Sequence, residues 1–361
     1  MTVRRLVVLV ALAVVAVGAW AGWRQYARLD APYRGYTGAE QFVEVPSGLG
    51  TKAIGRLLVD AGVVCDLTTW RLAVWRSGEA TALKAGEYRF TDAVSPAGVV
   101  TRIVRGDVYL RSITFPEGLT IRQMAALYEE SGLGTARDFV AAAGEVQLIS
   151  AFDPTARNLE GYLFPDTYSL PRRASARDLV KRMVGRFESV MTPELRQEAA
   201  DRGLSMRQAV TLASLVEKET AAPDERPVVA AVYHNRLRRR IGLQCDPTVI
   251  YALELRGHFN GNLTRADLDI DSPYNTYRYR GLPPGPIAAP GRLSLEAAVR
   301  PAAVEHLYFV SRNDGSHAFA STLDEHNRNV QKYQVEFFRR SGARSQKPEA
   351  RSKKPEAGSK K

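Results

Sequence analysis

One glutamate on a predicted helix gives the clearest sign of chemistry in this sequence. Ser205, followed three residues later by Gln208, has the pattern of a capping box, which fixes the start of a helix. At 100° per residue, Glu217 continues the apolar stripe of this helix, which is formed by Met206, Ala209, Val210, Ala213 and Val216. Apolar surroundings and the negative end of the helix dipole both favour a protonated carboxyl group. We therefore predict that Glu217 is a general acid; the alternative is a buried carboxylate held by an ion pair or by backbone donors.

The other reactive residue types offer less. Glu219 lies about 160° from Glu217 around the helix, so we expect it to be more solvated or paired with Arg or Lys. The five histidines contain no HExxH motif, and neither Cys65 nor Cys245 has a nearby metal-ligand partner. The sequence has no Gly-x-Ser-x-Gly elbow and no Walker A loop. We predict no metal, no cofactor and two separate thiols.

Four loops suit a groove for a polar ligand, because they are rich in Tyr, Asn, Asp and Thr and are stiffened by proline. They cover residues 160–168, 244–248, 272–277 and 281–286. Any one of them alone would be an ordinary turn. Four in one mainly helical region favour a groove.

Two similar segments lie 70 residues apart. Val43–Leu49 (VEVPSGL) aligns without a gap with Ile113–Leu119 (ITFPEGL). Each predicts a strand, a Pro-x-Gly turn and a helix, which ends at Gly62 or at Gly132. Between the copies we predict two helices and a strand, over residues 68–76, 95–105 and 86–90. Small βααβ-type modules of this sort bind glycan in wall proteins; a stalk or packing domain is the alternative.

Most of the net charge lies at the two ends. Of the formal net charge of +11, residues 1–30 carry +3 and residues 339–361 carry +7. The nearly neutral body argues against the basic face that a nucleic-acid-binding protein needs. Residues 6–23 contain no charge and would extend about 27 Å as a helix, close to the hydrocarbon thickness of a bilayer.

We predict a single membrane anchor over residues 1–24, with the N-terminus in the cytoplasm and the body on the extracytoplasmic side. The alternative is a cleaved signal peptide, because Ala19-Trp20-Ala21 fits the cleavage pattern. Residues 339–361 repeat Lys-Pro-Glu-Ala and are predicted to be a disordered basic tail.

Five segments resemble the signature segments of the MltG/YceG family of endolytic murein transglycosylases. They occur in the family's order and are Leu159–Tyr168 (LEGYLFPDTY), Leu212–Thr220 (LASLVEKET), Asp246–Tyr251 (DPTVIY), Tyr274–Tyr277 (YNTY) and Gly281–Ile287 (GLPPGPI). The resemblance extends from the N-terminal span to about Phe338. It departs at Cys245, where we expect threonine; this change could alter a groove contact but leaves the catalytic assignment untouched.

The resemblance implies an α+β fold with an N-terminal transmembrane helix. A LysM-like βααβ-type module would follow over residues 40–111, and a mainly helical α+β catalytic domain over residues 112–338. Glu217, the first glutamate of Glu-Lys-Glu-Thr, would be the catalytic residue. The candidates for holding sugar hydroxyls and acetamides, or for orienting Glu217, are Glu219, Gln244, Asp246, Tyr274, Asn275 and Tyr277.

The activity that the resemblance implies is that of a carbon–oxygen lyase, which cuts nascent peptidoglycan strands internally and so ends their elongation. Glu217 would protonate the oxygen between N-acetylmuramic acid and N-acetylglucosamine, then take the proton of the muramyl 6-hydroxyl as a 1,6-anhydro end forms. Because water is not the nucleophile, no second carboxylate is required. The alternatives are a muramidase that uses water and a non-catalytic glycan-binding organiser of wall synthesis. The expected partners are glycan strands, the cell inner membrane and peptidoglycan synthases, with no nucleic acid.

Overall fold

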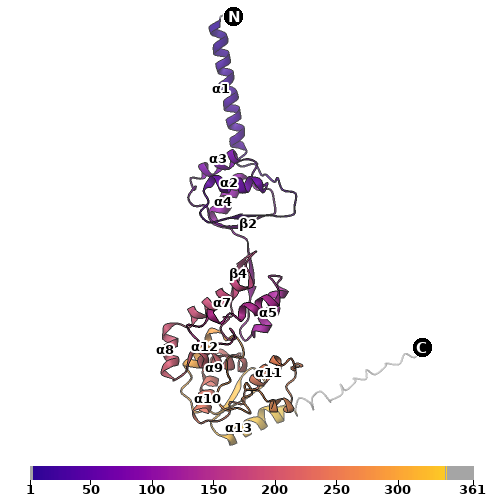
Figure 1. Cartoon of the computed structure of the whole chain (residues 1–361), viewed down its shortest axis with the longest axis vertical. Helices are drawn as coiled ribbons and strands as arrows, with labels where there is room; N and C mark the ends of the chain where they lie inside the picture. The colour runs from indigo at the N-terminus through magenta and orange to yellow at the C-terminus, as the bar shows by residue number, and fades with distance from the viewer. Residues whose placement is uncertain (1–2, 338, 340–361) are drawn as a thin grey trace, which may run out of the picture. The chain divides into compact units, whose positions relative to one another are not determined.

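The computed structural model describes residues 3–337 and 339 of the 361-residue chain (Figure 1). Helices and strands are mixed, which confirms the predicted α+β class. The chain divides into two compact units, the first formed by residues 1–112 with 169–174 and the second by residues 113–168 with those from 175 onward. The predicted disordered tail lies outside the described residues, apart from Arg339.

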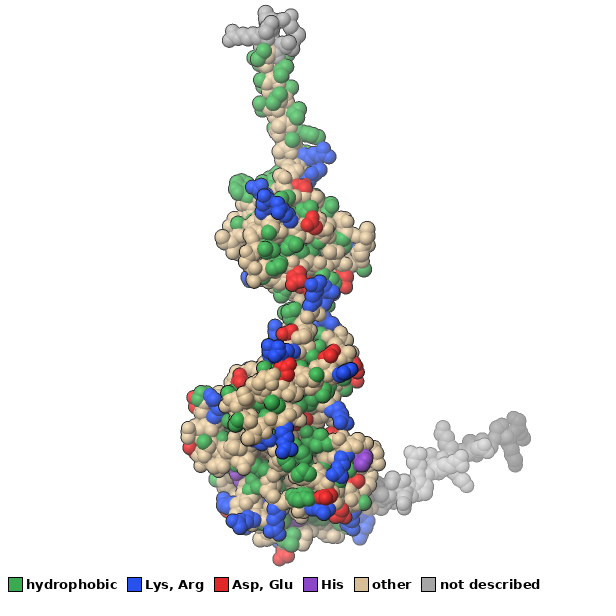
Figure 2. Space-filling view, viewed as in Figure 1, with side chains coloured by type: hydrophobic (Ala, Val, Ile, Leu, Met, Phe, Trp, Pro, Cys, Tyr) green, Lys and Arg blue, Asp and Glu red, His purple; other side chains and the backbone are tan. Residues whose placement is uncertain are grey.

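The first unit begins with α1 (Val3–Ala27), whose apolar side chains stand exposed in Figure 2. Residues Val7–Ala27 have a mean hydropathy of 1.9 and are long enough to cross a membrane; a signal sequence would have the same length and composition. The residues that follow α1 join the unit, because Leu29 is fully buried and Asp30 pairs with Arg76.

The rest of the first unit follows the order that the sequence predicted. Its elements are β1 (Gln41–Val45), α2 (Thr51–Asp60), α3 (Leu67–Ser77), β2 (Gly86–Phe90) and α4 (Pro96–Arg105). Strands β1 and β2 are antiparallel, with Val43 opposite Tyr88. Trp70 is fully buried under α2, where its indole N–H donates to the Thr51 carbonyl over 2.8 Å. Gly55 makes this packing possible, since a Cβ there would lie 2.2 Å from the Trp70 ring.

The second unit is mainly helical. Strands β3 (Leu110–Thr114) and β4 (Thr167–Pro171), which pair with each other, cross between the two units in sequence. The second unit holds α5 (Ile121–Glu130), α6 (Ala136–Ala143), α7 (Ala176–Val190), α8 (Pro193–Asp201), α9 (Met206–Glu219), α10 (Arg226–Arg238), α11 (Asp246–Leu255), α12 (Arg292–Val299) and α13 (Leu323–Val330). It also holds the antiparallel hairpin of β5 (Tyr308–Ser311) and β6 (His317–Ala320), 3₁₀ turns at Val146–Leu148, Pro223–Glu225 and Arg265–Asp269, and a π-helical turn at Gln331–Glu336.

Helix α9 is the central element of the second unit. The predicted capping box is present, with Ser205 and Gln208 each accepting a hydrogen bond from the other's backbone N–H. Residues 209–216 are buried on every side of the helix, including the polar Thr211 and Ser214. The Ser214 hydroxyl donates to the Thr211 carbonyl and accepts from the Ile287 backbone N–H, which ties the loop before α12 to α9. The same loop brings Gly291 to the Glu217 end of the helix.

Candidate active site

Glu217 lies in the last turn of α9 with its side chain only 6% exposed. Its Oε1 accepts a hydrogen bond from Arg226 Nη2 over 3.0 Å, and its Oε2 accepts from the Gly291 backbone N–H over 2.9 Å. The buried position agrees with the prediction from the apolar stripe. The counter-charge from Arg226 was not predicted, and its contact is the kind that the structural alternative expects.

Arg226 also holds a second carboxylate. It lies at the start of α10 with its side chain 7% exposed, and the same Nη2 donates to Glu117 Oε2 over 3.3 Å. The Arg226 Nε is buried without a hydrogen-bond partner among the described residues. Sequence reasoning missed both residues. The available signal was the repeat, in which Glu117 takes the place of Ser47 between the proline and the glycine of the turn.

Three segments meet at this carboxylate pair. The Gly118 N–H donates to the Ala289 carbonyl, and the Ala289 N–H donates to the Leu119 carbonyl, each over 2.8 Å. Lys218, next to Glu217, donates from Nζ to the Gly118 carbonyl over 3.2 Å. The loop after β3, the loop before α12 and the end of α9 are therefore fixed to one another by hydrogen bonds to the backbone.

The environment of Glu219 corrects the prediction that this carboxylate is solvated or paired with a cation. Its carboxyl group is enclosed, and Oε1 accepts from the Tyr233 hydroxyl over 2.9 Å. Burial raises the pKa of the Glu219 carboxyl and of the Cys245 thiol beside it. Cys245 is 1% exposed, so its side chain supports the end of α9 from within and does not face a groove. Cys65 and Cys245 are both free thiols, as predicted.

Three of the other predicted site residues gather at the start of α11. Gln244 and Asp246 are exposed, and Tyr277 is 37% exposed. The Tyr277 hydroxyl donates to Asp246 Oδ1, and Arg236 donates to Gln244 Oε1 over 3.3 Å. These side chains form a polar surface beside the buried Glu219 network, where burial and the hydrogen bond to Asp246 raise the pKa of the Tyr277 hydroxyl.

Tyr274 and Asn275 have different environments although they are adjacent. Tyr274 is half-buried in a cavity of about 160 Å³, with its ring centroid 4.9 Å from that of Tyr251. Asn275 is fully buried, and its Nδ2 donates to two backbone carbonyls, those of Leu268 and Ile270. Asn275 therefore shapes the loop and leaves no surface for a sugar.

The same cavity contains a buried acid that sequence reasoning did not select. Glu160 accepts hydrogen bonds from the Ile121 backbone N–H over 3.0 Å and from the Tyr251 hydroxyl over 3.2 Å. Burial raises the pKa of Glu160 to about 8, so this carboxyl group is mostly protonated at neutral pH. Its position at the N-terminus of α5 gives it a structural task, since it satisfies one of the first backbone donors of that helix.

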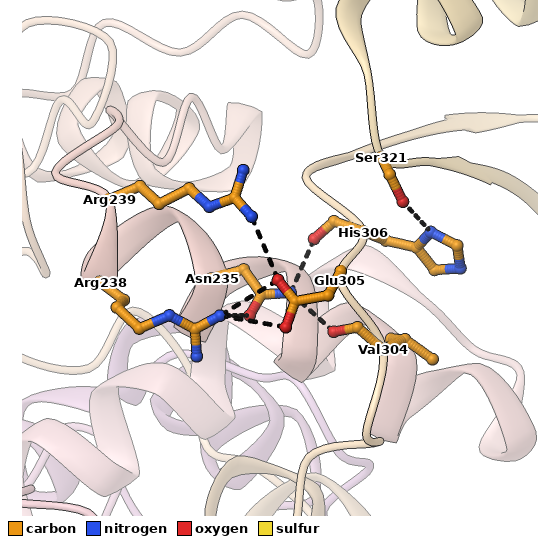
Figure 3. Close-up of polar contacts among 7 residues, drawn as sticks. All are labelled: Asn235, Arg238, Arg239, Val304, Glu305, His306 and Ser321. Carbon is orange, nitrogen blue, oxygen red and sulfur yellow. Dashed lines mark hydrogen bonds and ion pairs between the residues drawn. The ribbon is translucent and has the colours of Figure 1, made fainter.

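Another polar cluster, shown in Figure 3, lies around the end of α10 beside a cavity of about 730 Å³. Asn235 Nδ2 donates to the carbonyls of Val304 and His306 over 2.8 and 2.9 Å. Arg238 and Arg239 pair with Glu305, whose side chain is 68% exposed. Solvent screens such exposed ion pairs. The side-chain amide of Asn235 already donates to backbone carbonyls. This cluster holds the 304–306 segment on α10, whereas the ion pair of Glu217 and Arg226 is enclosed.

Comparisons with known proteins agree on one family. The model of the YceG-like family matches residues 43–332. The endolytic murein transglycosylase of Bacillus subtilis (strain 168) is 33% identical over 307 residues, which are 81% of this chain and 84% of the relative. A protein of the same name from Streptococcus pneumoniae serotype 2 is 29% identical over 354 residues, 89% of this chain and 63% of the relative. The crystal structure of a YceG-like protein from Listeria monocytogenes aligns with a TM-score of 0.55 and 30% identity, covering 80% of this chain and 98% of that one.

Proposed function

The chain belongs to the YceG-like family, and we propose that it is an endolytic murein transglycosylase, a lyase that cleaves peptidoglycan strands internally. The observation that carries this proposal is the similarity over more than four-fifths of the B. subtilis relative of that name. The enclosed Glu217 in the motif that resembles the family's catalytic segment supports it, because a sheltered carboxyl group is suited to general acid catalysis.

In the proposed mechanism, Glu217 acts first as acid and then as base. A proton on Glu217 passes to the glycosidic oxygen as the bond to the muramyl anomeric carbon breaks, which leaves a carboxylate on the enzyme. Arg226 and the Gly291 N–H are placed to stabilise that carboxylate, since both donate to it. The muramyl 6-hydroxyl then attacks the anomeric carbon and returns its proton to Glu217, which gives the 1,6-anhydro end and restores the acid.

We divide the predicted substrate-binding residues by their exposure. The surface of Gln244, Asp246 and Tyr277, together with the half-buried Tyr274, offers polar groups and aromatic faces that suit sugars. Glu219 and Asn275 have their polar groups enclosed, so we assign them to the support of α9 and of the loop before Tyr277.

We also propose that the first unit is a LysM-like glycan-binding module and that α1 anchors the chain in the cell inner membrane. The βααβ order and the antiparallel β1–β2 pair support the module. The length and hydropathy of Val7–Ala27 support the anchor, with the N-terminus cytoplasmic and the catalytic unit outside. Peptidoglycan synthases, which make the strand that is cut, are the partners that this placement suits.

The test of the proposed function is digestion of purified peptidoglycan, with the products identified by mass spectrometry. The wild type should release fragments with 1,6-anhydro ends, and Glu217→Gln should release none while it remains folded at the assay temperature. Glu305→Gln is the matched control, because it removes a carboxylate that pairs with two arginines on the surface. Reducing ends would identify a muramidase that uses water. Undiminished anhydro products from Glu217→Gln would remove the catalytic assignment.

A further inference from the structure

Two carboxylates share one guanidinium nitrogen in the catalytic unit. Arg226 Nη2 lies 3.0 Å from Glu217 Oε1 and 3.3 Å from Glu117 Oε2, so both carboxylates are within direct reach of one positive charge. With both carboxylates ionised, the three side chains carry one net negative charge. With one proton added, they are neutral.

This charge count bears on a difficulty in the proposed mechanism. A general acid must hold a proton before it reacts, yet a lone arginine beside Glu217 would favour the ionised carboxylate. A second negative charge on the same arginine opposes that effect, because it offsets the attraction that Arg226 exerts on the Glu217 carboxylate. Glu117 supplies such a charge.

The other charged groups around Glu217 have partners of their own. Lys218 Nζ donates to the Gly118 carbonyl, and Arg292, which follows Gly291, lies 3.8 Å from Glu296. Glu225, which precedes Arg226, accepts from the backbone N–H of His317 and pairs with its ring Nδ1 over 2.6 Å. Glu117 and Glu217 are thus the carboxylates on Arg226 in the part of the chain that the structure describes.

The position of Glu117 is built into the backbone. Gly118 has a φ of +79°, which turns the chain directly after Glu117 and lets the Gly118 N–H reach Ala289. The Glu117 carboxylate lies against Gly291, where a Cβ would come within 1.8 Å of Oε1. Because Gly291 has no side chain, it leaves room for Glu117, and its backbone N–H donates to Glu217.

We propose that Glu117 is a positioning residue, which shares Arg226 with Glu217 so that Glu217 can hold the proton that it donates. The Glu117 side chain is 45% exposed, whereas Arg226 is 7% exposed and remains in contact with Glu217 once that proton has gone. The buried Arg226 Nε has no hydrogen-bond partner among the described residues, so the guanidinium has a donor that is not engaged. This inference rests on the proposed function of Glu217 as the acid.

The kinetic test compares the full-length wild type with Glu117→Gln over a range of pH. The alkaline limb of kcat/KM should move to lower pH by about one unit, so that activity beyond the limb falls about tenfold while activity at acid pH is nearly kept. Ser47→Ala, at the matching place of the first copy, should leave the profile unchanged. A uniform loss at every pH, or an unshifted profile, would overturn the proposal.

A second measurement does not depend on cleavage. The infrared band of the protonated Glu217 carboxyl group can be assigned because Glu217→Gln removes it. The pH dependence of this band is then measured in the wild type and in the Glu117→Gln variant. The band should disappear at lower pH in Glu117→Gln. An unchanged titration would refute the role of Glu117 even if the enzyme is active. Conversely, if the wild type forms no anhydro ends, the proposed function is rejected. The titration then still shows whether Glu117 affects the protonation of Glu217.

Discussion

The two copies of the strand–turn–helix repeat have nearly the same backbone and different surroundings. Gly48 and Gly118 have φ angles of +80° and +79°, and Gly62 and Gly132, which follow the two helices, both have +68°. Helices α2 and α5 each contain ten residues, and the aligned Ile54 and Met124 are both buried. Local sequence therefore determines the shape of both copies.

The surroundings decide which copy borders the candidate active site. A Cβ on Gly48 would meet nothing within 4 Å, whereas a Cβ on Gly118 would lie 3.7 Å from Lys218 and 3.8 Å from Glu217. Ser47 is exposed, while the aligned Glu117 reaches Arg226. The same turn is thus a surface feature in the first unit and a wall of the candidate active site in the second.

The largest expected difference between the two copies is in how the stability of their helix N-termini depends on pH. The first backbone donor of α5 is held by Glu160, whose pKa rises to about 8 from a usual 4.5, whereas α2 starts at Gly50 without a side-chain cap. The folded protein holds this proton more tightly than the unfolded chain. The stabilisation is therefore complete below pH 4.5 and is lost as the pH rises to about 8, a change on the order of 5 kcal/mol.

The measurement is the free energy of unfolding of the second unit between pH 4.5 and 8.5, in the wild type and in Glu160→Gln. Glutamine keeps the acceptor for the Ile121 N–H and has no proton to lose, so the variant should show a flatter dependence. The first unit should show none of this slope. Equal slopes in the wild type and the variant would contradict the assignment to Glu160.

The next expected effect separates two glycines that begin helices. Gly50 before α2 and Gly291 before α12 both have a φ of −76°, but only at Gly291 would a Cβ collide with a side chain, that of Glu117. Gly291→Ala should lower glycan cleavage about 100-fold, about 2.7 kcal/mol, because it displaces Glu117 and disturbs the N–H bond to Glu217. Gly50→Ala should leave cleavage unchanged. Equal activities of the two variants, measured by release of anhydro fragments, would argue against the crowding of Glu117.

The features that the sequence predicted are mainly local ones. The helix expected over residues 68–76 is α3, the capping box at Ser205 is present, and the repeat has the expected elements. These depend on residues a few positions apart. The site around Glu217 also depends on distant residues, since Gly291 is 74 residues away and Glu117 reaches Arg226 across 109 residues. Helical angle alone likewise misplaced Glu219, because burial by Tyr233 and Cys245 comes from other segments.

The smallest effect tests the repeat itself through its two turn glycines. Gly48→Ala and Gly118→Ala should each destabilise their own unit by about 1 kcal/mol, because both place a side chain in the left-handed region of backbone space. Only Gly118→Ala should also slow glycan cleavage, since the strained turn would be in van der Waals contact with Lys218 and Glu217. Unfolding of each variant measures the loss of stability, and a separate cleavage assay measures the loss of activity. If the two variants lose equal stability but only Gly118→Ala loses activity, the same turn has a structural role in the first unit and an additional role in cleavage in the second. If both variants lose activity equally, the turn affects the site only through stability.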